Sequence, residues 1–199
     1  MGRRGEHGLE KIREMAIEAA EALVAEGGIE QLSTRKVAAR IGYTAGTLYL
    51  VFKDINHLVL EVNGRTLDAL RATLDAAGKP LKDDRKAVAA ICRAYLAFSK
   101  AHPALWSLLF ERHWGLGFER PDWYQAKKAD CFRPLAQRLQ GLGIARDVQH
   151  LEGLTRILWS SIHGTCVLNE DDKLTQAGAW ESERQIDLQV ELFLRAAKP

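Results

Sequence analysis

The segment from residue 33 to residue 53 contains the side chains best suited to hold a polyanion. It has four basic residues and no acidic residue, whereas residues 1–55 as a whole contain eight Lys or Arg and eight Asp or Glu. The four basic residues are Arg35, Lys36, Arg40 and Lys53. Because only a docking surface has to be positive, this local excess of positive charge indicates contact with a phosphate backbone.

Two short helices joined by a turn are expected to position these side chains. The first is expected from residue 33 or 34 to residue 41, and the second over about residues 45–52. Ala38 is small enough to let the second helix approach, and Gly42 falls at the turn, where glycine easily adopts a positive φ. Thr44 is a suitable N-cap for the second helix.

One side of the second helix is expected to be exposed and able to read DNA bases. The exposed positions are Thr44, Ala45, Thr47 and Leu50. A short helix that begins with small polar residues can lie in the major groove with its N-terminal end against the base edges. The alternative is a basic, solvated helical hairpin that has no partner.

The rest of the chain is typical of an all-α protein. Its 199 residues, 22.2 kDa and 47% hydrophobic content suffice for a large core. Apolar residues recur at three- and four-residue steps, so about nine helices and no strand are expected. No apolar run approaches the ~18–20 residues of a membrane helix, and the N-terminus lacks the apolar stretch of a secretory signal. A soluble cytoplasmic protein is therefore expected.

Helix stops and caps divide the chain into its expected elements. The expected stops and caps are Gly27 and Gly28, Asp54, Asp83 or Asp84, and Pro103. A long helix is expected to begin at Asp54 and to end before Gly78. Later helices are expected over about residues 103–110, 122–141 with a kink at Pro134, 146–168 and 178–197, with a loop over 112–121.

Residues 37–54, VAARIGYTAGTLYLVFKD, resemble the helix-turn-helix of the TetR family of bacterial transcriptional regulators. The resemblance extends from about Leu9 to Leu67. Its most specific positions are Gly46, Thr47, Leu48, Tyr49 and Phe52. It implies a DNA-binding domain over residues 8–68 and a ligand-binding and dimerisation domain over residues 69–199. WSSIHG at 159–164 is similar to the Trp, His, Gly signature of one subgroup of these C-terminal domains.

The resemblance also implies which residues contact double-stranded DNA. They are Thr34, Arg35, Lys36, Thr44, Ala45, Gly46, Thr47, Tyr49, Leu50 and Lys53. Of these, the residues at the start of the first short helix and Tyr49 would meet phosphates. Val51 stands where His or Tyr is usual, and Ile55 stands where a phosphate-binding Lys is frequent, which leaves Lys53 a larger share of backbone contact. Because the second helix has few Arg, Asn or Gln side chains, operator specificity is expected to rest on methyl contacts, water and DNA shape.

Aromatic residues concentrate in the C-terminal two thirds of the chain. Four of the five tryptophans lie between residues 106 and 159. A packed aromatic core is one interpretation, and an apolar cavity for a hydrophobic or aromatic small effector is the other. The residues expected near such an effector are Phe98, Trp106, Phe110, Trp123 and His163. His163 and Cys166 have helical spacing, but without a third ligand nearby they predict a buried histidine rather than a metal site.

The last two helices are expected to pair with those of a second subunit. Their apolar stripes are Leu151, Leu154, Leu158, Ile162 and Thr165, and Ile186, Val190, Phe193 and Leu194. Gly153, Ser160, Ser161 and Gly164 would permit close approach of helices, although both stripes could instead face their own core. A twofold dimer presents two recognition helices to successive major grooves, about 34 Å apart, and predicts a palindromic operator.

Other functional classes have less support in the sequence. The chain has no ExxH pair, no GxSxG and no paired carboxylates at helical ligand spacing, so an enzyme, a metal site or a cofactor is not expected. The three cysteines, Cys92, Cys131 and Cys166, have no CxxC spacing and are expected to be buried. A helical adaptor or ligand-binding protein without specific DNA binding remains the alternative to a ligand-switched repressor.

Overall fold

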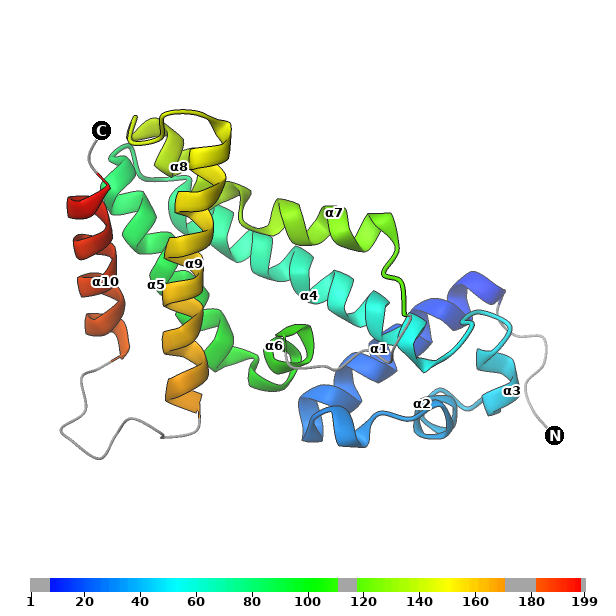
Figure 1. Cartoon of the computed structure of the whole chain (residues 1–199). Coiled ribbons are helices and arrows are strands. Elements are labelled where there is room, and N and C mark those ends of the chain that lie inside the picture. The colour runs from blue at the N-terminus through cyan, green and yellow to red at the C-terminus, as the bar shows by residue number, and fades with distance from the viewer. Residues whose placement is uncertain (1–7, 111–117, 171–181, 198–199) are drawn as a thin grey trace. The chain divides into compact units, whose positions relative to one another are not determined.

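The structure is a computed structural model that describes residues 8–110, 118–170 and 182–197. Over these ranges it contains ten α-helices, one 3-10 turn and no strand (Figure 1). The helices are α1 (Leu9–Gly27), α2 (Thr34–Arg40), α3 (Ala45–Leu48), α4 (Ile55–Gly78), α5 (Asp84–Ala101), α6 (Pro103–Phe110), α7 (Asp122–Cys131), α8 (Arg133–Gly141), α9 (Val148–Glu170) and α10 (Ser182–Ala196), and the 3-10 turn is η1 (Ile29–Gln31). The all-α prediction is confirmed. No helix of the described residues is both long and apolar enough to span a membrane.

Several helix ends lie where the sequence predicts them, and local hydrogen bonds or glycine backbone freedom explain their positions. Gly28 follows the last residue of α1 with a φ of 74°, a left-handed conformation that favours glycine. Ser33 Oγ accepts a hydrogen bond from the Lys36 amide (3.2 Å) and so caps α2. Asp83 Oδ1 accepts from the amides of Arg85 and Lys86 and so caps α5.

Asp54 is the N-cap of α4. Its Oδ1 accepts hydrogen bonds from the amides of Asn56 (2.8 Å) and His57 (3.1 Å), and it also lies 2.9 Å from His57 Nδ1. Burial raises the pKa of Asp54, but the hydrogen bonds and charge of His57, with the Asn56 amide, outweigh burial and hold the pKa below its ordinary value. The predicted cap is confirmed.

The expected helix over residues 122–141 is two helices, α7 and α8, separated at Phe132. Pro134 has no N–H with which to continue the helical ladder to the carbonyl of Asp130. That carbonyl instead accepts a hydrogen bond from Arg71 Nη1 (3.4 Å). The sequence predicted one helix with a kink at Pro134, whereas the structure has a complete break between two helices. Of the expected loop over 112–121 and helix over 178–197, residues 112–117 and 178–181 lie outside the described residues.

The chain packs as two compact units. The first unit is residues 1–68 with 102–127, and the second is residues 69–101 with 128–199. α6 thus packs with the N-terminal helices. The expected domains, 8–68 and 69–199, stay predictions, because a packing unit need not coincide with a functional domain.

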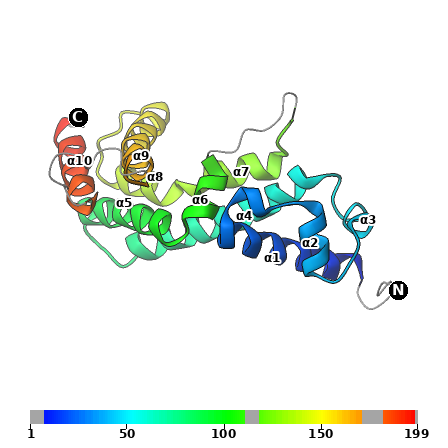
Figure 2. The ribbon, with the colours of Figure 1, turned by 90° about the horizontal axis from the view of Figure 1, so that it is seen from below.

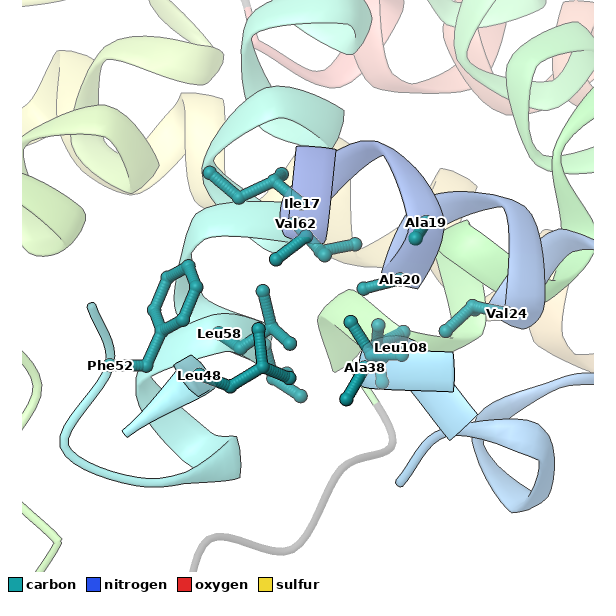
Figure 3. Close-up of a cluster of buried hydrophobic side chains, with 13 residues drawn as sticks. Ile17, Ala19, Ala20, Val24, Ala38, Leu48, Phe52, Leu58, Val62 and Leu108 are labelled. Carbon is teal, nitrogen blue, oxygen red and sulfur yellow. The ribbon is translucent and has the colours of Figure 1, made fainter. Parts of the chain in front are cut away.

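The core of the first unit lies between α1, α2, α3 and the first half of α4 (Figures 2 and 3). Its buried residues come from all four helices and include Ile17, Val24, Val37, Ala38, Leu48, Phe52, Leu58 and Val62. Leu108 of α6 is buried in the same cluster. α6 is therefore part of the support beneath the short helices α2 and α3.

The core of the second unit is formed by α5, α8, α9 and α10, which contact one another. The predicted apolar stripes of α9 and α10 point into this core, where the buried members are Leu154, Leu158, Ile162, Thr165, Ile186, Val190 and Leu194. These stripes therefore pack within the subunit. A dimer through the same two helices would have to use their other faces.

Replacing the cap of α4 is expected to destabilise the protein. Asp54→Ala should lower the free energy of unfolding by about 1 kcal/mol, because two amides of the first turn lose their acceptor. Folding lowers the pKa of Asp54, so the ionised carboxylate stabilises the folded state. This contribution to the free energy of unfolding is fully present above the ordinary Asp pKa and is lost as the pH falls through the lowered pKa. Denaturant titration at neutral and acidic pH checks this. Asp54→Asn is the matched control, and an equal loss in both variants would contradict the capping role.

Candidate functional site

α3 and the turn after it align three side chains along one edge. The Thr47 amide donates to the Thr44 carbonyl (3.0 Å), and the Leu50 amide donates to the Thr47 carbonyl (3.2 Å). Turns closed by such three-residue hydrogen bonds place side chains i and i+3 over each other. The hydroxyls of Thr44 and Thr47 are accordingly within hydrogen-bond distance, 3.1 Å apart. We call Thr44, Ala45, Thr47 and Leu50 the reading face.

The opposite side of α3 is anchored in the core of the first unit. Leu48 is 2% exposed and Phe52 is 7% exposed, and both belong to the buried cluster that includes Val37 and Ala38 of α2 (Figure 3). Gly42 makes the turn between α2 and α3 with a φ of 76°. The inferences that Ala38 and Gly42 allow close packing of the two helices are consistent with this arrangement.

Two details of α3 differ from the sequence prediction. The α-helix ends at Leu48, and residues 49–51 form a turn, so the helix is shorter than the expected 45–52. Thr44 occupies the N-cap position with extended backbone angles, but its side chain makes no capping hydrogen bond. Its hydroxyl pairs with Thr47 instead. In this pair one threonine hydroxyl donates a hydrogen bond and the other accepts it.

Within the part of the chain that the structure describes, three of the four cations of the helix-turn-helix are exposed and make no ion pair. Arg35, Lys36 and Lys53 are exposed, and Lys36 Nζ donates to the neutral Gln31 Oε1 (2.6 Å). Arg40 differs, because its guanidinium makes two hydrogen bonds to the Glu26 carboxylate (2.7 and 2.5 Å). This hydrogen bonding raises the pKa of Arg40 and lowers that of Glu26. The expected positive surface is thus carried mainly by the other three residues.

Thr34 and Tyr49, both expected at phosphates, lie at a common site. They line one small hollow together with residues at the start of α4, Asp54 and Ile55. Tyr49 is 58% exposed, and Thr47 and Thr34 are half-buried. Neither Tyr49 nor Thr47 is packed inside the molecule, and Gly46, which precedes Thr47, is exposed.

The expected effector residues divide between the two units. Trp106, Phe110 and Trp123 belong to the first unit, where the rings of Trp106 and Phe110 lie 5.2 Å apart. Trp123 packs edge-on against Tyr124 and close to Gly64, where an added Cβ would lie 3.0 Å from the indole. Phe98 and His163 belong to the second unit.

His163 lies in an aromatic cluster that the sequence only partly indicated. Its Nδ1 is 2.9 Å from the Tyr95 hydroxyl, and its ring lies 5.3 Å from that of Trp159. Phe132 packs against Trp159 at 4.7 Å. Trp159 was recognisable one turn before His163, whereas Tyr95 and Phe132 come from α5 and the α7–α8 junction and carried no sequence signal of proximity.

Two hollows among the described residues of the second unit differ in character. One of about 470 Å³ is lined mainly by polar and charged residues of α4, α5 and α8, namely Asp75, Gly78, Lys79, Asp84, Ile91, Pro134, Gln137 and Arg138. Its volume is in the range of small-molecule sites. The other, beside Tyr95 and Trp159, has about 10 Å³, which is room for about one water molecule.

The cysteines are buried, as predicted. Cys92, Cys131 and Cys166 all lie in the interior, and among the described residues none of the three forms a disulfide. Burial raises the pKa of Cys92 to about 12, so this thiol stays protonated at neutral pH. Within the described residues, no cluster of three or more His, Cys, Asp or Glu side chains could hold a metal ion.

Comparison with known protein families assigns the chain. Residues 16–62 match the family described as bacterial regulatory proteins, tetR family, and residues 88–193 match the tetracyclin repressor-like C-terminal domain. The chain belongs to the TetR family. The resemblance inferred from residues 37–54 is therefore confirmed, and this TetR-family chain is a transcriptional regulator. The Trp, His, Gly subgroup stays a prediction.

Solved structures share the fold of this TetR-family chain at low sequence identity. A protein of unknown function from Rhodococcus sp. RHA1 is 19% identical, with a TM-score of 0.77 and 98% of both chains covered. The TetR family regulator PfmR from Thermus thermophilus is 19% identical, with a TM-score of 0.62 over 90% of this chain and 97% of that one. RolR in complex with resorcinol is 16% identical, with a TM-score of 0.66 over 96% and 89%. No curated protein matches the chain.

If this surface binds DNA, substitutions of its cations and substitutions of its reading face should change DNA binding in different ways. Lys53→Ala should weaken binding to all duplex sequences alike and reduce the salt slope by about 1, because one phosphate contact is lost. Tyr49→Phe should weaken binding to all duplex sequences alike, without changing the charge of the protein. Thr47→Ala should change which sequences are preferred. Fluorescence anisotropy with duplexes at several salt concentrations measures these effects.

Lys100→Ala, which removes an exposed lysine of the second unit, is the control for net charge. A loss in Lys100→Ala as large as that in Lys53→Ala would show that the effect is not local to the helix-turn-helix.

Proposed function

We propose that this regulator is a ligand-responsive repressor that binds a palindromic operator as a dimer. The observation that carries the proposal is the reading face, in which Thr44 and Leu50 are exposed and Ala45 and Thr47 are half-buried, while Leu48 and Phe52 fix the other side of α3 in the core. A short element held in this way can enter the major groove without reorganising. Because the target is chromosomal DNA, we place its action in the bacterial cytoplasm.

The charge around the reading face supports DNA as the partner. Arg35, Lys36 and Lys53 are exposed, and residues 33–53 contain no acid that would repel a phosphate. Arg40 is neutralised by Glu26, so a modest number of phosphate contacts is expected for each subunit. Two subunits double that number, which gives a dimer the affinity that one subunit lacks.

The outer faces of α9 and α10 support dimerisation through these helices. Ile157 is 62% exposed and Leu168 is 41% exposed on α9, while Leu188 and Leu192 are exposed one turn apart on α10. A Cβ added at Gly153 or Gly164 would meet nothing within 4 Å, so α9 leaves room for another helix. Exposed leucines and isoleucines around such small residues fit a second copy of the same surface.

α6 gives the effector a route to the recognition helix within the first unit. Trp106 and Phe110, which we expect near the effector, lie on the same helix as Leu108, which is buried in the core that supports α3. Buried Asn63 of α4 donates through Nδ2 to the Leu108 carbonyl (3.4 Å). A ligand that moved α6 would therefore disturb the support of the reading face and bias the DNA-competent state.

A charge on the outer face of α10 tests the dimer. Leu192→Glu should give a monomer in sedimentation velocity with the fold intact, because Leu192 is 54% exposed. It should also bind a duplex selected from a random library at least tenfold more weakly, since two half-sites are no longer engaged together. Val148→Glu, at a still more exposed position of the second unit, is the control and should remain dimeric.

A wild-type protein that is monomeric both in solution and on DNA would contradict the dimer. Failure to select any duplex, together with no salt-dependent DNA binding, would favour the alternative of a helical adaptor or ligand-binding protein.

Intrinsic tryptophan fluorescence tests the effector proposal. Resorcinol, the ligand of RolR, serves as the first small aromatic probe. Saturable quenching is expected, and it should be reduced in Trp106→Phe and weakened in affinity in Phe110→Ala, both on α6, if these residues line the site. Release of the selected duplex at the same probe concentration would link the two sites. If a series of small aromatic probes gives no saturable change, the hydrophobic or aromatic effector is wrong.

A further inference from the structure

The reading face has no side chain that can make the two-bond contacts by which proteins distinguish guanine or adenine. Those contacts need Arg, Lys, Asn or Gln, and the reading face consists of Thr44, Ala45, Thr47 and Leu50. Its two hydroxyls are 3.1 Å apart and engage each other. Apart from these hydroxyls, the groups that the face offers to a base are apolar, and Leu50 is the largest of them.

Leu50 is the most exposed large apolar side chain of the helix-turn-helix. It is 69% exposed, although its neighbours Leu48 and Phe52 are almost completely buried. The hydrogen bond from the Leu50 amide to the Thr47 carbonyl sets Leu50 on the same edge as the two threonines. Its exposure follows from this turn, which directs one leucine into the core and the next toward solvent.

The major groove offers one apolar group, the C5-methyl group of thymine. The thymine methyl is thus the complement of an exposed leucine at the edge of a recognition element. We propose that Leu50 is a specificity-determining residue, which contacts a thymine methyl at one position in each half-site of the operator. This proposal rests on the proposed function, because it requires that the reading face enters the major groove.

Replacing thymine by uracil isolates this contact. Uracil pairs with adenine through the same hydrogen bonds and lacks only the methyl group. Starting from a duplex selected by the wild-type protein, each symmetric pair of thymines is replaced in turn by uracil, and binding is measured by anisotropy at constant salt. At the symmetric pair of thymines that Leu50 contacts, the affinity of the wild type should fall by about fourfold for each half-site. This is the loss expected when about one methyl group is no longer buried.

The Leu50→Ala variant completes the test. It should bind the thymine duplex more weakly than the wild type and should no longer distinguish thymine from uracil at that pair. Since Leu50 is largely exposed, the thermal midpoint of unfolding should be unchanged. Val148→Ala, which shortens another exposed apolar side chain in the second unit, should keep the wild-type response to uracil.

Two outcomes would contradict the role of Leu50, and a third would contradict the proposed function itself. If the wild type binds every uracil duplex as tightly as its thymine counterpart, no methyl is read and the inference is wrong. If Leu50→Ala keeps the full response to uracil, another side chain reads the methyl and the inference is also wrong. If no duplex can be selected at all, the proposed function fails before the role of Leu50 is reached.

Discussion

A helix as short as α3 is not stable by itself in water, so its position depends on the burial of Leu48 and Phe52 in the core of the first unit. α1, α2 and α4 contribute most of the surrounding surface, and Leu108 of α6 completes it. The reading face is therefore only as well ordered as this core. For the same reason, a change in the packing of α6 reaches the reading face without any direct contact to DNA.

The electrostatics of the first unit are local rather than global. The protein has a formal net charge of only +2, yet residues 33–53 are free of acids. Arg40 pairs with Glu26 at the end of α1, which ties α2 to α1, so the proposed phosphate contacts fall to Arg35, Lys36 and Lys53. One cation thus supports the fold while its neighbours remain available to a partner. With few cations for each subunit, sequence discrimination by apolar groups becomes more important.

Features that depend on neighbouring residues in the chain could be predicted from the sequence. The caps at Asp54 and Asp83, the stop at Gly28 and the turn at Gly42 follow from side-chain hydrogen bonding or from glycine backbone freedom, which act over a few residues. The extent of α3 and the break at Phe132 were missed. The break involves Arg71, which is far away in sequence and satisfies the carbonyl that Pro134 leaves without its helical donor. Two aromatic residues of the His163 cluster, Tyr95 and Phe132, were missed for the same reason, because they come from other elements.

The sequence by itself determined the all-α class, the helix-turn-helix and the residues expected on its exposed side, since hydrophobic periodicity and capping are encoded locally. The tertiary structure decided which apolar stripes are buried inside the subunit. The stripes of α9 and α10 that begin at Leu154 and Ile186 are buried in their own core, and this leaves Ile157 and Leu192 outward. It also decided which cation is neutralised. Periodicity reveals that a helix has an apolar face, but only the packing of distant elements determines what that face meets.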